Sequence, residues 1–253
     1  MASPDPREGP AVSTVDSTEV AKFNAMAEAW WDPHGDFKPL HILNPTRIAF
    51  IRDVATRHFE REPGEAPLEG LSLCEIGCGG GLLTEPMRRL GADVTGVDPS
   101  ARNIGIARRH AEASGLKITY LQCAAEDMVE RGESFDIVLA MEVVEHVANV
   151  DVFIASCAQL VKPGGLMFLA TLNRTAKAFA LAIVGAEYVM RWLPRGTHDW
   201  RKFVKPSELA HPLRRAGFAI EQLTGVTYNP LADRWSLSRD LDVNYMLVAK
   251  RPI

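Results

Sequence analysis

The chain has 253 residues, of which 47% are hydrophobic and 24% are charged, so it can form one large α/β domain or at most two small ones. Its formal net charge is -4, with 28 basic and 32 acidic residues and no basic stripe, which argues against nucleic acid as a partner. The four cysteines form no C-x-x-C pair and have no histidine cluster beside them, so we expect reduced thiols rather than a zinc site.

The first residues of the chain combine proline, serine and acidic side chains, with little apolar surface to bury. We therefore expect residues 1–15 to be a disordered tail and residues 16–253 to form a single domain. The tail lacks the basic start and apolar run of a secretory signal, and no stretch reaches the roughly eighteen apolar residues of a membrane span. These features predict a cytoplasmic protein.

Two helices are predicted before the first strand. The first begins at Ser17, because apolar residues follow it at three- and four-residue spacing, namely Val20, Phe23, Met26, Ala27 and Trp30. The second is expected to begin at Asn44, a good N-cap residue, with Pro45 in its first turn.

Strands then alternate with helices, which predicts parallel βαβ units and a sheet covered on both faces. The expected strands are residues 71–76, 92–97, 118–121, 135–140 and 166–171, and the expected helices are residues 82–90, 100–114 and 151–161. A turn is expected at residues 162–165. Residues 218–226 and 245–249 are also predicted to be strands, and because no helix lies between them they should form an antiparallel pair at the sheet edge.

A glycine-rich loop follows the first strand, with Gly77, Gly79 and Gly81 at alternate positions. Glycines allow a tight turn and the close approach of a ligand to the backbone, and a helix follows the loop. The second strand ends at Asp98, about twenty residues further on, where an acidic side chain can accept hydrogen bonds from ribose hydroxyls. This combination predicts a nucleotide-containing ligand rather than a bare turn.

The alternative is a dinucleotide dehydrogenase, whose fingerprint is G-x-G-x-x-G, whereas this loop reads G-x-G-x-G. Glu75 lies just before the loop, where its carboxylate would repel a pyrophosphate but could pair with an α-amino group. The pattern therefore favours S-adenosylmethionine, which has an amino acid end and no phosphate, over NAD.

Two carboxylates and an imidazole follow the strand at residues 135–140, and they belong to Glu142, Glu145 and His146. Ligands of open α/β sheets bind beyond the carboxyl ends of the strands, so these side chains are candidates for a site beside the glycine loop. The alternative is that the two acids are solvated and the histidine is simply packed.

At this point the sequence closely resembles a known family, the bacterial ubiquinone biosynthesis O-methyltransferases. The similarity extends from about Val15 to Ala249. Its most specific elements are the strings F-K-P-L-H, V-G-A-E-Y and V-N-Y-M-L, at residues 37–41, 184–188 and 243–247.

The resemblance implies a Rossmann-like class I methyltransferase fold, with a seven-stranded, mostly parallel sheet whose last strand is antiparallel. It implies two S-adenosylmethionine-dependent O-methylations in one pathway, on a polyprenylated catechol and on demethylubiquinol, and contact with a biosynthetic assembly. Carried over by position, the cofactor residues are Arg47, Gly77, Asp98 and Met141. Residues 16–62 should then fold over the cofactor, with Arg47 on its carboxylate. Many methyltransferases have an acid at the position of Ala124, so adenine recognition falls here to backbone groups or to Glu126.

Methylation of a phenol needs a phenolate, because a phenol with a pKa near 10 is a poor nucleophile at neutral pH. His146 could accept the proton as a general base. Alternatively, Glu142, Glu145 and His146 could hold Mg²⁺ or another divalent cation that binds both catechol oxygens. Both mechanisms are compatible with the E-x-x-E-H spacing.

A long connection at residues 172–205 contains an apolar segment, residues 176–193, which is too short to span a bilayer. Composition alone favours a core or dimer helix. A polyprenylated substrate instead favours an interfacial helix and a peripheral position on the inner face of the membrane. Two further functions remain open: a methyltransferase acting on another small phenol, and a non-catalytic lipid-binding subunit of the same pathway.

Overall fold

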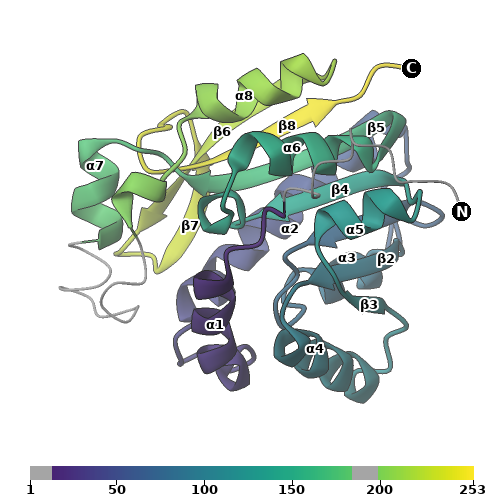
Figure 1. Cartoon of the computed structure of the whole chain (residues 1–253), viewed down its shortest axis with the longest axis horizontal. Helices are drawn as coiled ribbons and strands as arrows, with labels where there is room; N and C mark the ends of the chain where they lie inside the picture. Colours follow the sequence, from purple (N-terminus) through teal and green to yellow (C-terminus); the bar gives the residue numbers. More distant parts are fainter. Residues whose placement is uncertain (1–12, 184–198) are drawn as a thin grey trace, which may run out of the picture.

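The computed structural model describes residues 13–183 and 199–253, and their centre is one twisted sheet (Figure 1). The strand order is β3-β2-β1-β4-β5-β8-β6-β7. The parallel strands are β1 (Ser72–Ile76), β2 (Asp93–Asp98), β3 (Thr119–Gln122), β4 (Phe135–Met141) and β5 (Val161–Leu172). The antiparallel strands are β6 (Ala219–Asn229), β7 (Arg234–Ser238) and β8 (Asn244–Lys250).

Helices cover both faces of the sheet, as the alternating sequence pattern predicts. On one face lie α5 (Ala125–Glu130), α6 (Val150–Gln159) and α8 (Pro206–Arg215), which share an apolar core with β4 and β5. On the other face lie α2 (Lys38–His58) and α3 (Thr84–Arg89), which pack with the opposite side chains of the same strands. The helix α4 (Ala101–Ala113) packs beside β3 at the sheet edge. Burial on both faces explains why the central strands are apolar at nearly every position.

The predicted class of sheet is confirmed, but the sheet has eight strands rather than seven. The extra strand, β7, pairs only with β6, and none of its five residues, all within the described part of the chain, is buried. Of these five residues only Trp235 packs against the core, and it is only partly buried, so the strand carries little apolar signal in the sequence. The turn expected at residues 162–165 is instead part of β5, which begins at Val161. The expected C-terminal pair is β6 and β8, and β8 lies between β5 and β6.

The second helix begins at Lys38 and not at Asn44, so the prediction of an N-cap at Asn44 was wrong. Pro39 occupies the first turn, the position that a missing backbone N–H tolerates best. Asn44 instead lies inside the helix, where its buried amide Nδ2 donates to the carbonyl of Leu82 at 2.7 Å. Its Oδ1 accepts from Nη2 of Arg47 at 2.8 Å, so Asn44 joins α2 to the segment after the glycine loop.

Ordered structure begins before residue 16, inside the segment assigned to the tail. Thr14 is buried, and its carbonyl accepts a hydrogen bond from the backbone N–H of Ala148 at 2.9 Å. Val15 forms an antiparallel bridge with Val147. The described residues 13–15 therefore join the chain to the connection after β4, directly before the first helix.

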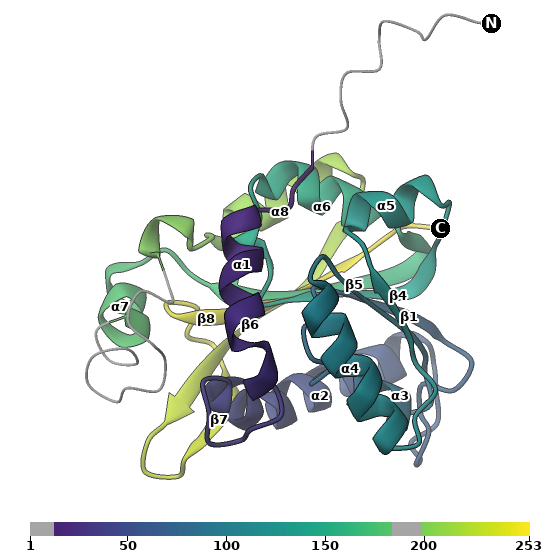
Figure 2. The same cartoon turned by 60° about the horizontal axis from the view of Figure 1, so that its bottom comes forward.

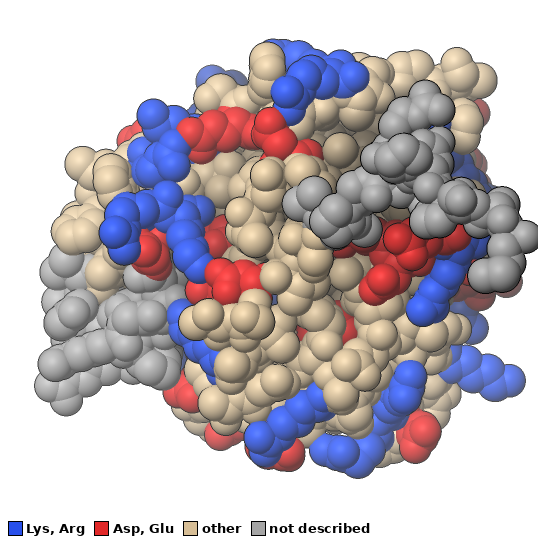
Figure 3. Space-filling view, in the orientation of Figure 1, with Lys and Arg blue, Asp and Glu red and all other residues tan. Residues whose placement is uncertain are grey.

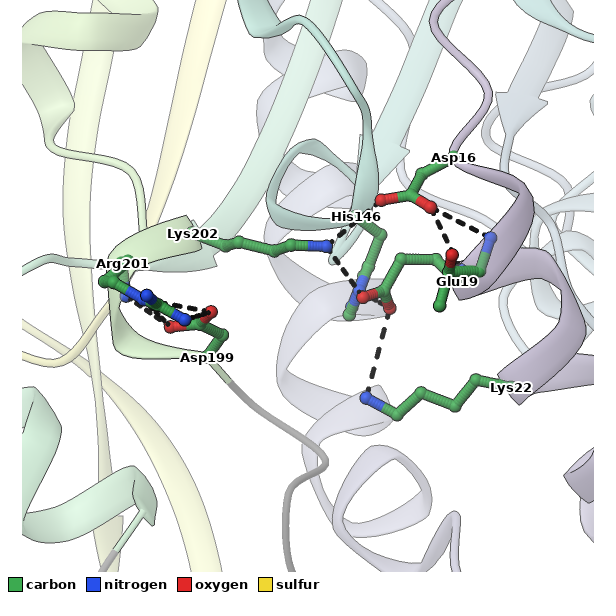
Figure 4. A network of polar contacts seen from close by, with 8 residues as sticks. Asp16, Glu19, Lys22, His146, Asp199, Arg201 and Lys202 are labelled. Atoms are coloured by element: carbon green, nitrogen blue, oxygen red, sulfur yellow. Dashed lines mark hydrogen bonds and ion pairs between the residues drawn. The ribbon is translucent and has the colours of Figure 1, made fainter.

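That helix, α1 (Ser17–Met26), lies beside α4, as Figure 2 shows. None of its ten residues, all of them described, is buried, so apolar burial contributes less to its attachment than in the other helices. Polar contacts hold it to the rest of the molecule (Figure 4). Glu19 accepts from Nδ1 of His146 and from Nζ of Lys202, both at 2.9 Å. Lys202 also contacts Asp16, the N-cap of α1, at 3.2 Å.

The Glu19 contact makes stability dependent on pH. The hydrogen bond from His146, reinforced by Lys202, lowers the pKa of Glu19 from 4.5 to about 2. The carboxylate therefore stabilises the folded state above about 4.5, and this contribution is lost as the pH falls toward 2. We expect Glu19→Gln to lower the free energy of unfolding by on the order of 2 kcal/mol at neutral pH, and by progressively less in acid. Urea unfolding at a series of pH values measures this difference.

The exposed Glu62, in the connection between α2 and β1, provides the matched control. Glu62→Gln should leave the free energy of unfolding unchanged throughout the same pH series. A loss in Glu19→Gln that is equally large at neutral and acid pH would show that the ionised carboxylate is not what stabilises the fold.

Candidate cofactor and substrate site

The glycine loop lies at the carboxyl end of β1 and is tied to β2. The backbone N–H groups of Gly77 and Cys78 donate to the carbonyl of Val97 at 2.8 and 3.0 Å. Gly77 has φ +71° and Gly79 has φ +53°, a region that other residues rarely adopt. A Cβ at Gly77 would lie 2.6 Å from the side chain of Val143, which belongs to the connection after β4. These positions therefore require glycine for both conformation and space.

Asp98 ends β2 on the same edge of the sheet and is almost completely buried. Its Oδ2 accepts from the N–H of Gly79 at 3.0 Å, and its Oδ1 accepts from the N–H of Ser100 at 2.8 Å and from Nδ2 of Asn103 at 3.2 Å. Burial raises the pKa of Asp98, and these three donors oppose that effect. A carboxylate has about four acceptor positions, so it can still accept from a ligand hydroxyl.

Arg47, Glu75 and Glu142 bring opposite charges together beside the loop. Arg47 is buried in α2, and its Nε has no hydrogen-bond partner among the described residues. Burial raises the pKa of Glu75 to about 7, although its Oε2 accepts from Oγ1 of Thr84 at 2.5 Å. Burial and the neighbouring Glu145 raise the pKa of Glu142, which the charge of Arg47 opposes. A buried cation and poorly compensated carboxyl groups can bind a zwitterion.

Glu145 and His146 lie in the short 3₁₀ helix η2 (Val144–His146), directly after β4. Glu145 is buried, and its Oε2 accepts from Oγ1 of Thr171 at 2.9 Å. Burial raises the pKa of Glu145. His146 is only partly buried, and its Nδ1 contacts Glu19.

The three side chains proposed as metal ligands, Glu142, Glu145 and His146, are therefore adjacent but do not converge. Within residues 13–183 and 199–253, no group of three His, Cys, Asp or Glu side chains is arranged to hold a metal ion. The E-x-x-E-H spacing suggested a cluster, but Glu145 is directed to Thr171 and His146 to Glu19. This arrangement of side chains does not by itself support the metal hypothesis, which stays a prediction to be tested with a chelator.

Two adjoining cavities lie at this edge of the sheet, with volumes of about 510 and 120 Å³. The smaller contains the polar and backbone groups around Asp98, Ser100, Asn103 and Ala124. The larger contains Arg47, Glu75 and Met141 at one end and is otherwise mainly apolar. The residues that line both cavities are Phe23, Trp30, Gly77, Glu142 and His146.

Most of the predicted cofactor residues thus line one cavity or both. Gly79 and Gly81 are not among the described residues that line these two cavities. Gly79 holds Asp98 through its N–H, and Gly81 lies against the hydroxyl group of Tyr120, so both shape the loop. Glu126 also lines neither of these cavities, and its two carboxylate oxygens are buried without a partner in the described part of the chain. Its suggested role in adenine recognition is not supported.

Two adjacent tryptophans that the sequence reasoning missed pack against the glycine loop. Trp30 stacks on Phe37 with ring centroids 3.8 Å apart, and its Nε1 donates to Oδ1 of Asn103 at 3.0 Å. Trp31 stacks on His110 with centroids 3.4 Å apart, and its Nε1 donates to the carbonyl of Gly80 at 2.9 Å. The W-W pair was visible in the sequence, but only as the end of a helical pattern.

The apolar insertion begins with the short helix α7 (Ala176–Ala178), which continues as a π-helical turn through residue 183. Phe179 is 47% exposed and Leu181 is 53% exposed. Leu181 also lines the larger cavity, whereas Ile183 packs against the buried Phe203. The remainder of the segment, residues 184–193, lies outside the described residues.

The surface agrees with the charge balance of the sequence. On the face shown in Figure 3, basic and acidic side chains are interspersed, without a stripe of one sign. Among the helices of the described residues, none combines the length and the apolar character needed to cross a bilayer.

Comparison with known proteins identifies the family of this chain. Residues 43–223 match the methyltransferase domain family. The chain is 59% identical over 244 residues to the ubiquinone biosynthesis O-methyltransferase of Sinorhizobium medicae (strain WSM419), covering 96% of this chain and 98% of that protein. It is 60% identical over 242 residues to the protein of the same name from Rhizobium rhizogenes (strain K84 / ATCC BAA-868), with 95% and 98% covered.

Solved structures show the same fold at lower identity. Magnesium protoporphyrin IX methyltransferase from Synechocystis PCC 6803 with bound SAH has a TM-score of 0.60 and 21% identity, covering 91% of this chain and 94% of that one. The same enzyme with bound SAM has a TM-score of 0.59 and 19% identity, covering 96% and 99%. The expected class I methyltransferase fold is thereby confirmed. On the identity and coverage of its relatives, this chain belongs to the family of ubiquinone biosynthesis O-methyltransferases.

Proposed function

We propose that this protein transfers a methyl group from S-adenosylmethionine to phenolic hydroxyls in ubiquinone biosynthesis. Its substrates are a polyprenylated catechol and demethylubiquinol, so that one site performs both O-methylations. The observation that carries the proposal is the 510 Å³ cavity, which has buried charges at the glycine loop and an otherwise apolar lining. Such a cavity suits a charged cofactor end beside an apolar, aromatic substrate.

The charged groups suit the two ends of S-adenosylmethionine. Arg47 can bind the carboxylate of the amino acid end, because its Nε is buried without a partner among the described residues. Glu75 and Glu142 flank Arg47 and can pair with the α-amino group, directly or through water. Asp98 can accept from ribose hydroxyls, and Met141, buried at the end of β4, lines the larger cavity.

S-adenosylmethionine supplies the methyl group on a sulfonium, which is displaced in line by an oxygen nucleophile. The apolar walls of the larger cavity align the phenol and exclude water, which lowers the entropic barrier. His146 lines both cavities and is the residue we assign as general base. It accepts the phenol proton on its Nε2, and the phenolate oxygen then forms the new bond to carbon.

The start of the apolar insertion supports a peripheral contact with the inner face of the membrane through residues 176–193. Phe179 and Leu181 expose apolar surface to solvent, which is unfavourable unless a partner covers it. Leu181 also belongs to the wall of the cavity, so a polyprenyl tail could pass from the bilayer to the site beside it. Lys177 lies next to these residues, but its ammonium is paired with Asp240 and Asp242, so the proposed contact rests on the apolar side chains.

The cofactor assignment predicts the effect of Asp98→Ala. This substitution removes the ribose acceptor and should weaken S-adenosylmethionine binding by about 1–3 kcal/mol, measured by calorimetric titration. Asp93→Ala, at the exposed beginning of the same strand, is the matched control and should bind normally. NAD should bind poorly to the unmodified protein, and comparable affinities for the two ligands would refute the assignment.

The base assignment predicts that His146→Ala lowers turnover of short-tailed demethylubiquinol at least about a hundredfold, the low end for a lost general base. The affinity for S-adenosylmethionine should change little. The same assay is performed with and without a chelator. Activity that survives the chelator supports the free base. Activity that is lost and then restored by Mg²⁺ would favour a metal-bound phenol, and unchanged turnover would remove His146 from the mechanism.

The membrane assignment predicts that the protein sediments with anionic liposomes and that the double variant Phe179→Asp, Leu181→Asp loses this binding. Each large side chain contributes about 1.5–3 kcal/mol when fully desolvated in lipid, so the loss should exceed tenfold. Leu223→Asp with Leu237→Asp, also exposed but on β6 and β7, is the matched control. Undiminished binding of the first variant, with its fold intact by circular dichroism, would mean that the protein attaches elsewhere.

A further inference from the structure

The side of the larger cavity away from the glycine loop is built by strands at the antiparallel end of the sheet. The strand order β1-β4-β5-β8 places β8 three strand spacings from β1, which is about 14 Å. The residues of β5 to β8 that line the cavity form a wall, which consists of Leu172, Val226, Thr227, Tyr228, Trp235 and Asn244. The proposed cofactor groups lie on α2, β1, β2 and the end of β4, so this wall belongs to the substrate end of the cavity.

One carboxamide stands in the middle of this wall. In β8, Asn244 pairs with Leu172 on one side and with Val226 on the other. Residues directly opposite each other in antiparallel strands point to the same face, so the three side chains form a row. All three line the cavity, and the carboxamide of Asn244 therefore lies between two apolar neighbours at the cavity surface.

No protein partner explains this carboxamide. Among the described residues, no hydrogen bond involves the side chain of Asn244, which is only partly buried. The ladder on both sides uses only its backbone, and asparagine is a poor strand former, so the strand itself does not require this residue. The hydroxyl of Tyr228 in the same wall, by contrast, already donates to Asp233 at 2.6 Å. Asn244 thus offers an N–H donor and a C=O acceptor to the occupant of the cavity.

The strand ends place this carboxamide across β5 from the acids that follow β4. The backbone N–H of Glu142 donates to the carbonyl of Ala170 at 2.9 Å, so the end of β4 lies beside β5 just before Leu172. Asn244 lies on the other side of Leu172. Two strand spacings, about 10 Å, separate β4 from β8, which leaves room for a pair of neighbouring ring oxygens between side chains that reach in from both strands.

We propose that Asn244 is a substrate-binding residue, whose carboxamide hydrogen-bonds the ring oxygen beside the one that is methylated. A catechol presents a hydroxyl at this place, which can accept from the N–H group or donate to the C=O of the amide. The proposal rests on the proposed function, because it takes the occupant of this cavity to be a catechol. An analogue without the second oxygen leaves the amide unpaired in an apolar wall, so Asn244 favours rings with two neighbouring oxygens.

The test compares two short-tailed substrates of the full-length protein: a catechol, and the matching phenol that keeps the reacting hydroxyl but lacks its neighbour. The quantity measured is the ratio of kcat/KM for the catechol to kcat/KM for the phenol, because any preference from another source is shared by all variants. Asn244→Leu removes both hydrogen-bonding groups but keeps the branching of the side chain, and Asn244→Ser restores a shorter polar group. Thr227→Val is the matched control, because it removes the hydroxyl of another residue of the same wall.

We expect Asn244→Leu to lower this ratio about tenfold, mainly through a loss on the catechol, because only that substrate uses the amide. Asn244→Ser should lie between Asn244→Leu and the unmodified protein, and Thr227→Val should keep the unmodified ratio. A second measurement does not depend on activity. Calorimetric titration of both phenols into protein saturated with S-adenosylhomocysteine, the cofactor without its methyl group, should show the same loss of preference in Asn244→Leu.

A loss of equal size on both phenols would mean that Asn244→Leu only disturbs the wall, and the inference would fall while the proposed function stands. The inference falls in the same way if Thr227→Val, rather than Asn244→Leu, changes the ratio. If the unmodified protein methylates neither phenol, the proposed function falls and the inference falls with it. If Asn244→Leu does not fold, Asn244→Ala and Asn244→Ser are judged by the same ratio and the same titration.

Discussion

The close approach of residues 27–37 to the glycine loop is the contact on which the site depends. The indole of Trp30 lies directly on the backbone of Gly79 and Gly80, where an added Cβ would come within 2.4 and 2.5 Å of the ring. Trp31 is tied to the same loop by its hydrogen bond to the carbonyl of Gly80. Any side chain on these glycines would push the N-terminal segment away and open the cavities that Trp30 lines. The glycines therefore serve the packing of the protein against itself as well as access for a ligand.

The buried charged groups at the polar end of the larger cavity are only partly compensated by one another. Burying charged groups costs free energy unless partners compensate, and burial raises the pKa values of Glu75 and Glu142 accordingly. Arg47 faces both carboxyl groups but keeps one N–H without a partner among the described residues. An amino acid zwitterion supplies a carboxylate for Arg47 and an ammonium for the acids. The charges at this end of the cavity therefore suit the amino acid end of the proposed cofactor.

The N-terminal helix connects the chemistry to this cavity. Its first turns contribute Glu19 and Phe23, which hold the imidazole of His146, and the residues after it pack on the glycine loop. Lys202, on the opposite side of Glu19, follows the apolar insertion in the chain. Residues near the proposed cofactor site, the proposed base and the proposed membrane contact are thereby joined through a few polar contacts around α1. A short helix that buries none of its described residues is suited to this role, because its attachment depends on specific partners rather than on a large apolar face.

The sequence by itself determined the βαβ order, the glycine loop, Asp98 at the end of β2 and the acids after β4, because each is a local pattern of periodicity or spacing. It did not determine the start of α2, where Pro39 rather than Asn44 marks the first turn. Nor did it reveal β7, of whose five described residues only Trp235 packs against the core. Only the tertiary structure decided what Glu145 and His146 contact. Their adjacency suggested shared metal ligation, which stays a prediction, and in the fold Glu145 contacts Thr171 whereas His146 contacts Glu19, 127 residues away in the chain. The partner of a buried polar side chain depends on which distant element packs against it, and no local pattern of residues contains that information.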